Sequence, residues 1–228
     1  MHAAPRLPEL GADRQREYRL GIMGGTFDPI HYGHLVTAEQ AREALELDLV
    51  LFMPAGIPAF KQDKRVTDAE DRYAMTVLAT AANPAFDASR FEIDRDGVTY
   101  TIDTLRALRA NYPDNVKLFF ITGADAILDL VTWHDAAAMA ELATFIAATR
   151  PGYDIEQARQ RVAASGVPFD VRYIEIPALA ISSTNIRARV SAKKSVRYLT
   201  SESVIGYIRK NGLYSSHAVE RVDGATAR

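Results

Sequence analysis

Two clusters of polar residues, far apart in the chain, have the composition of a phosphate-binding site. The first is the segment 24–34, Gly-Gly-Thr-Phe-Asp-Pro-Ile-His-Tyr-Gly-His, which follows a short apolar run. Its glycines allow backbone amides to approach a ligand closely, and a helix predicted to begin at Gly33 would direct its N-terminal N–H groups and dipole at an anion. No Gly-Lys-Ser/Thr follows, and the spacing differs from the dinucleotide-binding fingerprint. The segment therefore predicts a phosphate-binding loop without a P-loop lysine.

The two histidines of this loop, His31 and His34, are three residues apart where the helix begins, so they share one face. Imidazoles in this position can donate hydrogen bonds to phosphate oxygens and stabilise charge that develops on a leaving pyrophosphate. A zinc pair is the competing interpretation, but no third soft ligand is evident nearby in the sequence and the chain has no cysteine. A structural role for the pair is the other alternative.

The second cluster is the segment 181–187, Ile-Ser-Ser-Thr-Asn-Ile-Arg. A hydroxyl at a helix N-terminus often only caps the helix, which would explain one of Ser182, Ser183 and Thr184 but not all three. Arg187 follows one turn later and supplies a fixed positive charge. We therefore expect the hydroxyls and this guanidinium to bind the β- and γ-phosphates of a nucleoside triphosphate.

The elements that must position these clusters alternate along the chain. Apolar runs with strand character are followed by helical patterns, which predicts an α/β fold, a Rossmann-like doubly wound parallel sheet with C-terminal helices. In such a sheet ligands bind at the carboxyl ends of the strands, where both clusters would lie. The predicted strands are 18–23, 48–53, 91–93, 117–122, 144–148 and 171–176, and the predicted helices are 33–45, 67–82, 101–112, 125 onward, 155–164, 183–191 and 201–211.

Composition limits the classes of protein to which the chain could belong. It has 228 residues, of which 48% are hydrophobic, and a formal net charge of −2. We expect one domain over 18–214, with a flexible N-terminal extension over 1–17 and a polar tail over 215–228. The absence of cysteine excludes a disulfide framework, the first residues lack the apolar run of an export signal, and no apolar stretch is long enough to cross a membrane. These features predict a cytoplasmic protein without membrane partners.

One segment, 185–210, departs from this balanced charge. It has seven basic residues and a single acidic one, Glu202. A solvated basic face is the ordinary interpretation of such a run, and an anion-binding surface at the strand ends is the alternative. The overall charge gives no general drive for binding nucleic acid, so no nucleic-acid partner is expected.

The ordered set of motifs resembles the nucleotidyltransferase superfamily, which shares its His-x-Gly-His motif with class I aminoacyl-tRNA synthetases. The segments 24–34 and 181–187 are most similar to those of bacterial nicotinate-mononucleotide adenylyltransferases, and the similarity extends from about Arg19 to Tyr214. Further matching segments are Arg72 to Met75, Gly97 to Leu105, Thr122 to Asp125 with Trp133, and Arg150 to Tyr153.

This resemblance implies the transfer of an adenylyl group from ATP to nicotinate mononucleotide, giving nicotinate adenine dinucleotide and pyrophosphate, with Mg²⁺ held mainly by the ATP phosphates and no protein metal site. It assigns His31, His34 and Arg187 to catalysis. The ATP-binding residues it implies are Gly24, Gly25, Thr26, Phe27, Gly123, Asp125, Ser182, Ser183 and Thr184, and Arg150 is a further nucleotide contact. The mononucleotide-binding residues it implies are Lys61, Tyr100, Thr101 and Trp133. A homo-oligomer is compatible with the sequence.

Several of these residues have ordinary alternatives. Trp133 could pack in the core, Tyr100, Thr101 and Asp125 could cap helices, and Arg150 could be a loop charge. Phe60 stands where relatives commonly have a histidine, which puts the geometry of the loop 54–65 in doubt. Phosphopantetheine adenylyltransferase is the second candidate activity, and a non-catalytic nucleotide sensor that binds nucleic acid is the third. A tRNA synthetase is disfavoured by the length and by the lack of a Lys-Met-Ser-Lys-Ser-like loop.

Overall fold

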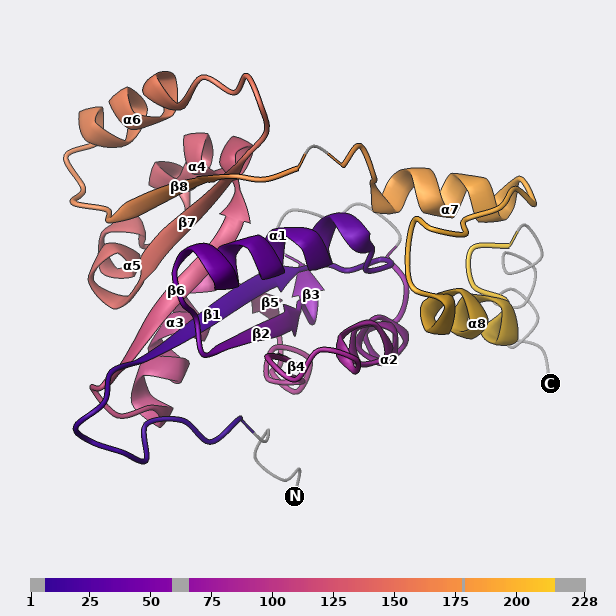
Figure 1. The fold of residues 1–228 in the computed structure, drawn as a ribbon, viewed down its shortest axis with the longest axis horizontal. Coiled ribbons are helices and arrows are strands. Elements are labelled where there is room, and N and C mark those ends of the chain that lie inside the picture. Colours follow the sequence, from indigo (N-terminus) through magenta and orange to yellow (C-terminus); the bar gives the residue numbers. More distant parts are fainter. Residues whose placement is uncertain (1–6, 59–65, 178, 216–228) are drawn as a thin grey trace.

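The centre of the molecule is a six-stranded sheet whose neighbouring strands are all parallel (Figure 1). The computed structural model describes residues 7–58, 66–177 and 179–215. The strands of this sheet are β1 (Tyr18–Gly25), β2 (Leu49–Pro54), β4 (Phe86–Ala88), β6 (Val116–Gly123), β7 (Thr144–Thr149) and β8 (Val171–Glu175). Two further strands, β3 (Ile57–Pro58) and β5 (Val98–Thr99), pair with each other beside the main sheet.

Helices connect the strands and cover both faces of the sheet. They are α1 (Tyr32–Ala44), α2 (Ala69–Thr80), α3 (Thr101–Asn111), α4 (Ala124–Asp129), a short 3₁₀ helix (Leu130–Thr132), α5 (Ala136–Leu142), α6 (Ile155–Ala164), α7 (Ser183–Ser191) and α8 (Glu202–Asn211). Figure 1 shows α7 and α8 beyond the carboxyl ends of β1 and β2, with α8 packed against α2. The prediction of a doubly wound parallel sheet with C-terminal helices is confirmed.

Two hydrophobic cores, one on each face, hold these layers together. In β2, Leu51 and Met53 point into the core that α3, α4, α5 and α6 cover, whereas Val50 and Phe52 point into the core of α1, α2 and α8. Successive side chains of a strand point to opposite faces, so a strand that is apolar throughout is suited to a sheet covered on both sides. This is the reason that the continuous apolar runs of the sequence correctly predicted central strands.

The strand order locates the place where a ligand would bind. The order is β4-β2-β1-β6-β7-β8, so the chain builds outward from β1 in one direction and then returns to place β6 on the other side of β1. The carboxyl ends of β1 and β6 therefore flank the topological switch point, where open α/β sheets bind their ligands. The glycines that end these two strands are Gly25 and Gly123.

One predicted strand was wrong. Residues 91–93 form a turn in which the N–H groups of Ile93 and Asp94 both donate to the carbonyl oxygen of Arg90, at 2.8 and 2.9 Å. The strand beside β2 is instead β4, five residues earlier. The apolar pattern of 91–93 arises because Phe91 is buried in the core, and a buried side chain in a turn has the same local pattern as one in a short strand.

The described part of the N-terminal segment contacts the domain. Leu7 and Leu10 pack against the core, and the Tyr112 hydroxyl donates to the carbonyl oxygen of Pro8 at 2.9 Å. The side-chain amide of Asn115 donates to the carbonyl oxygen of Asp13, also at 2.9 Å. Residues 7–16 thus cover the amino-terminal end of β6 in this structure. Among the described helices, none has both the length and the apolar character that crossing a membrane requires.

Candidate active site

The loop between β1 and α1 places the two histidines against each other. His31 immediately precedes α1 and His34 lies in its first turn, with the two imidazole rings stacked at a centroid distance of 3.7 Å. The backbone N–H of His31 donates to Nδ1 of His34 at 3.2 Å, and Phe27 packs its ring edge-on against His34. The pair on one face of the helix, expected from the spacing, is therefore present, and the two rings hold a fixed mutual orientation.

Burial determines the charge of His31. Its side chain is 6% exposed, and Nδ1 has no hydrogen-bond partner among the described residues. Desolvation lowers the pKa of His31 to about 4, because a buried site disfavours the charged imidazolium. His31 is therefore neutral at physiological pH and acts as a hydrogen-bonding group rather than as a fixed positive charge.

The two distant clusters of the sequence converge at this loop. The Ser183 hydroxyl donates to the carbonyl oxygen of Pro29 at 2.9 Å, and Nη1 of Arg187 donates to the carbonyl oxygen of Asp28 at 2.7 Å. These pairs are 154 and 159 residues apart in the chain. The convergence that the motifs predicted is present in the structure, and it places the Arg187 guanidinium beside the loop between β1 and α1.

The segment between α7 and α8 extends this contact. The Thr200 hydroxyl donates to the carbonyl oxygen of Ile30 at 2.8 Å, and the backbone N–H of Tyr32 donates to the carbonyl oxygen of Leu199 at 3.1 Å. The C-terminal helices are thus attached to the loop on both sides of His31.

The three hydroxyls of the second cluster have three different partners. Ser182 caps α7, accepting a hydrogen bond from the backbone N–H of Asn185 at 3.2 Å. Ser183 contacts the loop, and the Thr184 hydroxyl accepts from Nη2 of Arg187 at 3.3 Å. The capping alternative thus holds for Ser182 only. Thr184 instead helps to orient the guanidinium.

A buried arginine of α2 holds the loop through its backbone. No function was assigned to this residue from the sequence. Arg72 of α2 is 1% exposed and donates three hydrogen bonds to backbone carbonyl oxygens, at 2.8 Å to Thr67, 2.9 Å to Thr26 and 2.9 Å to Gly56. Burial lowers the pKa of Arg72, and the nearby Asp28 carboxylate opposes that effect. The available signal was an arginine at helical spacing with Met75 and Thr76 on the buried face of α2.

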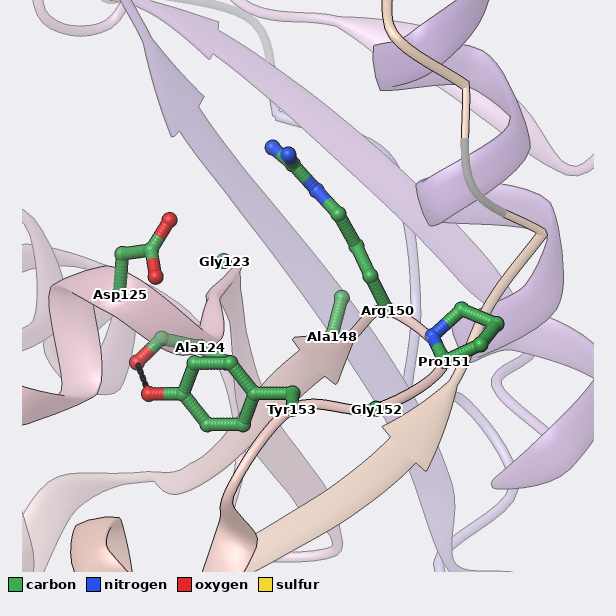
Figure 2. Close-up of a pocket in the computed structure, with 8 residues that line it drawn as sticks. All are labelled: Gly123, Ala124, Asp125, Ala148, Arg150, Pro151, Gly152 and Tyr153. Carbon is green, nitrogen blue, oxygen red and sulfur yellow. Dashed lines mark hydrogen bonds between the residues drawn. The ribbon is translucent and has the colours of Figure 1, made fainter.

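A pocket lies beside the loop, at the carboxyl ends of β6 and β7 (Figure 2). It has a volume of about 280 Å³. Its lining is Gly123, Ala124, Asp125, Ala148, Arg150, Pro151, Gly152 and Tyr153. The structure thus brings three of the predicted nucleotide-binding residues, Gly123, Asp125 and Arg150, into one cavity.

Within this pocket, the capping alternative for Asp125 is wrong. Gly123 is the N-cap of α4, and Asp125 is the second residue of the helix and exposed. The Tyr153 hydroxyl donates to the carbonyl oxygen of Ala124 at 2.9 Å, which ties the loop after β7 to the start of α4 (Figure 2). Arg150 is exposed, with its side chain extended beside the opening.

The predicted mononucleotide residues lie around the N-terminus of α3. Tyr100 is the N-cap residue and Thr101 the first helical residue, but no Tyr100 side-chain bond caps the helix. The Tyr100 ring contacts His134 at a centroid distance of 4.9 Å, and neighbouring Trp133 packs edge-on against Phe120 at 6.0 Å. Trp133 is half-buried, so it has a core contact and an accessible part.

His134 was not singled out from the sequence, where only its position after Trp133 could have indicated it. Two other residues, Lys61 and Phe60, lie outside the described residues.

The basic run 185–210 does not form a single surface. Arg187 contacts the loop between β1 and α1, whereas Lys193, Lys194, Arg197 and Arg209 line a separate cavity of about 440 Å³ between α7 and α8. Of these, Arg197 pairs with Glu202 at 3.2 Å. Across the described ranges, no three His, Asp or Glu side chains are grouped closely enough to hold a metal ion.

Comparisons with known proteins show the family to which the chain is similar. Residues 22–189 match the model of the family described as cytidylyltransferase-like. A protein of Moorella thermoacetica named "Probable nicotinate-nucleotide adenylyltransferase" is 53% identical over 212 residues, which cover 92% of this chain and 95% of the relative. One of Clavibacter sepedonicus with the same name is 55% identical over 199 residues, covering 87% and 94%.

The fold also matches a solved structure. Plasmodium falciparum nicotinic acid mononucleotide adenylyltransferase complexed with NaAD superimposes with a TM-score of 0.71 at 21% identity, covering 87% of this chain and 98% of that one. At this identity the match supports the fold alone.

Proposed function

The chain belongs to the cytidylyltransferase-like family, and we propose that it transfers the adenylyl group of ATP to nicotinate mononucleotide in NAD biosynthesis, forming nicotinate adenine dinucleotide and pyrophosphate. The observation that carries the proposal is the convergence of Arg187 and Ser183 on the backbone of Asp28 and Pro29 beside two stacked imidazoles. The relatives that share about half of the sequence have this activity in their names.

The chemistry needs positioning more than a protein nucleophile. The phosphate of the mononucleotide is already anionic near neutral pH, and one of its oxygens attacks the α-phosphorus of ATP. The bond from that phosphorus to the bridging oxygen breaks, and pyrophosphate leaves with the electron pair. Catalysis then depends on holding the two phosphates in line and on stabilising the charge on the leaving group.

The residues of the loop suit these two tasks. Arg187 supplies a guanidinium whose direction is set by the Asp28 carbonyl oxygen and the Thr184 hydroxyl. The imidazoles of His31 and His34 supply N–H donors for the phosphates, and the positive end of the α1 dipole favours their negative charge. Because His31 is neutral, it can donate a hydrogen bond to a phosphate without the energetic cost of keeping a buried positive charge in the free protein.

Mg²⁺ would be held chiefly by the ATP phosphates and, when bound, would supply positive charge that neutralises the leaving pyrophosphate. The donor set fits this role. The carboxylate of the loop, Asp28, is 4% exposed and accepts hydrogen bonds at both oxygens, so it is not arranged as a metal ligand.

The pocket at β6 and β7 takes the adenosine, with Asp125 as the ribose partner. The mononucleotide ring stacks on Trp133, and its carboxylate meets the backbone N–H groups at Tyr100 and Thr101, the N-terminus of α3. A carboxylate gains more from these donors than a carboxamide does, which favours nicotinate over nicotinamide mononucleotide as the acceptor.

A pyrophosphate-release assay tests the proposal. ATP is combined in turn with nicotinate mononucleotide, nicotinamide mononucleotide and phosphopantetheine, and each product is identified by mass. We expect the highest kcat/KM with nicotinate mononucleotide. A higher value with phosphopantetheine would contradict the proposal, and tight, salt-sensitive binding of duplex DNA without pyrophosphate release would favour the sensor alternative.

The variant Arg187→Ala tests whether the activity depends on the proposed site. We expect a folded protein with weaker use of ATP. Arg189→Ala is the matched control, since Arg189 lies on the same helix but donates to the carbonyl oxygen of Ser195, away from the loop. Equal activity of the two variants, or unfolding of Arg187→Ala alone, would contradict the assignment of Arg187.

A further inference from the structure

The last described residues of the chain return to the phosphate-binding loop. Helix α8 packs against α2 and buries Val204 and Ile208 in the core between them. Gly212, with a φ of 65°, ends the helix in the left-handed conformation that glycine adopts at low cost. The chain then turns, and the Tyr214 hydroxyl donates a 2.7 Å hydrogen bond to Oδ1 of Asp28, 186 residues earlier.

Asp28 is the point at which several parts of the molecule meet. Its Oδ1 accepts from Tyr214, and its Oδ2 accepts from the backbone N–H of Thr67 at 3.2 Å. Its carbonyl oxygen accepts from Arg187. With 4% of its surface exposed, the side chain depends on these protein donors rather than on water.

The chemistry of the phenol suits a permanent donor. Burial, and then the neighbouring Asp28 carboxylate, raise the pKa of Tyr214, so the hydroxyl keeps its proton at every pH at which the protein would work. A hydrogen bond from a neutral hydroxyl to a buried carboxylate is charge-assisted and therefore strong and directional.

Arg72 of α2 also holds the loop. It donates to the carbonyl oxygen of Thr26, two residues before Asp28, and its charge is compensated by the Asp28 carboxylate without a direct ion pair among the described contacts. The loop is thus held at the Thr26 carbonyl, the Asp28 carboxylate and the Asp28 carbonyl by groups from α2, from the chain beyond α8 and from α7.

We propose that Tyr214 is a positioning residue for catalysis: its hydroxyl holds the Asp28 carboxylate, and through Asp28 it fixes the direction in which the loop presents its histidines and receives Arg187. Tyr214 itself touches neither ATP nor the mononucleotide. The catalytic consequence rests on the proposed function, whereas the effect on the loop is a property of the free protein.

The matched variants are Tyr214→Phe and Tyr207→Phe. Each removes one tyrosine hydroxyl that donates to a carboxylate, but Tyr207, on α8, donates to Oδ1 of Asp71 on α2 at 2.9 Å and not to the loop. If Tyr214 had a structural role alone, the two variants would lose similar amounts of thermal stability, and neither would lose turnover. We expect Tyr214→Phe alone to lower kcat about tenfold, the effect of about 1.4 kcal/mol on a barrier.

The separate KM values for the two substrates provide a second test. The KM for ATP should rise in Tyr214→Phe, and the KM for nicotinate mononucleotide should change less than twofold. In the Asp28→Asn background, Tyr214→Phe should add little further loss, because the two residues act through one contact. Unchanged kcat in Tyr214→Phe, or full additivity with Asp28→Asn, would overturn the proposal.

Amide hydrogen exchange of the substrate-free protein separates this proposal from the proposed function. Tyr214→Phe should speed exchange in peptides that cover residues 24–31, and Tyr207→Phe should leave them unchanged. Equal protection in both variants overturns the positioning role of Tyr214. A wild-type protein that makes no nicotinate adenine dinucleotide defeats the proposed function instead, and the exchange comparison still decides whether Tyr214 holds the loop.

Discussion

The loop between β1 and α1 and the pocket beside it are built in opposite ways. Four successive or nearly successive carbonyl oxygens of the loop accept side-chain donors: Thr26 from Arg72, Asp28 from Arg187, Pro29 from Ser183 and Ile30 from Thr200. The pocket has one comparable bond, from Tyr153 to Ala124, and its Asp125 and Arg150 are exposed. Groups that stabilise developing charge must be held in place before the reaction, whereas a nucleoside can be recognised by side chains that adjust.

Among the predicted effects, the largest should come from replacing Arg72, which holds the loop. Arg72→Met removes a buried guanidinium, leaves three half-buried backbone carbonyl oxygens without this donor and removes the cation that compensates Asp28. We expect a loss of about 3–5 kcal/mol in the free energy of unfolding, measured with urea.

The matched control for this variant is Arg90→Met. Arg90 makes an ion pair with Glu70 at 2.6 Å on the surface, where the loss should be below about 1 kcal/mol. Equal losses in the two variants would show that the buried arginine does not hold the loop.

The next effect is on catalysis at the histidines. His31→Ala or His34→Ala should lower kcat/KM by about 10² or more, the effect of losing one preorganised donor to developing charge. The measurement is steady-state pyrophosphate release with both substrates varied. Each variant should also be checked for its unfolding transition, because the rings stack at 3.7 Å and each supports the other. Unchanged turnover in both variants would remove the histidines from the mechanism.

The burial of His31 predicts a pH dependence of stability. Its pKa is about 4 in the folded protein against an ordinary value of 6.5. Between these values the unfolded chain binds a proton at this site and the folded protein does not, so His31 stabilises the fold above pH 6.5 and this contribution is lost as the pH falls toward 4. The contribution is about 3 kcal/mol, and His31→Gln should abolish it in urea titrations at several pH values.

Glu92 provides the internal control for this titration, because its contribution to stability changes with pH in the opposite direction to that of His31. Burial raises the pKa of Glu92 to about 7 from 4.5, although the Thr104 hydroxyl donates to it at 2.7 Å. The folded protein therefore holds a proton that the unfolded chain loses, and this contribution is lost as the pH rises from 4.5 through 7. Glu92→Gln should remove only this second dependence. If neither variant changed the pH profile, burial would not control these two groups.

The smallest effect should come from the open pocket. Asp125→Asn should raise the KM for ATP no more than about tenfold, the scale of one weakened hydrogen bond, with kcat nearly unchanged. Asp129→Asn on the same helix is the control, since Asp129 lies outside the pocket lining. A loss in kcat as large as that of the histidine variants would mean that the pocket is as preorganised as the loop, and the contrast between the two regions would disappear.

Much of the fold was predictable because its strands are buried on both faces. Continuous apolar runs at β1, β2, β6 and β7 are a local signal, and the glycine-rich turn and the hydroxyl-rich helix start are local as well. The short edge strand β4 lacked such a signal, since it has three residues and only partial burial. Residues 91–93 misled the prediction because a core side chain in a turn imitates a strand.

The features of the site also separate into those with a local sequence signal and those without one. The sequence by itself determined the chemical groups, the two motifs and the alternation of most strands and helices along the chain, because residue type and short-range spacing carry that information. Only the tertiary structure decided that His31 is neutral, that Arg72 binds backbone carbonyl oxygens and that Tyr214 reaches Asp28. Desolvation and long-range hydrogen bonds depend on which segments pack together, and residues 186 positions apart have no local pattern in common.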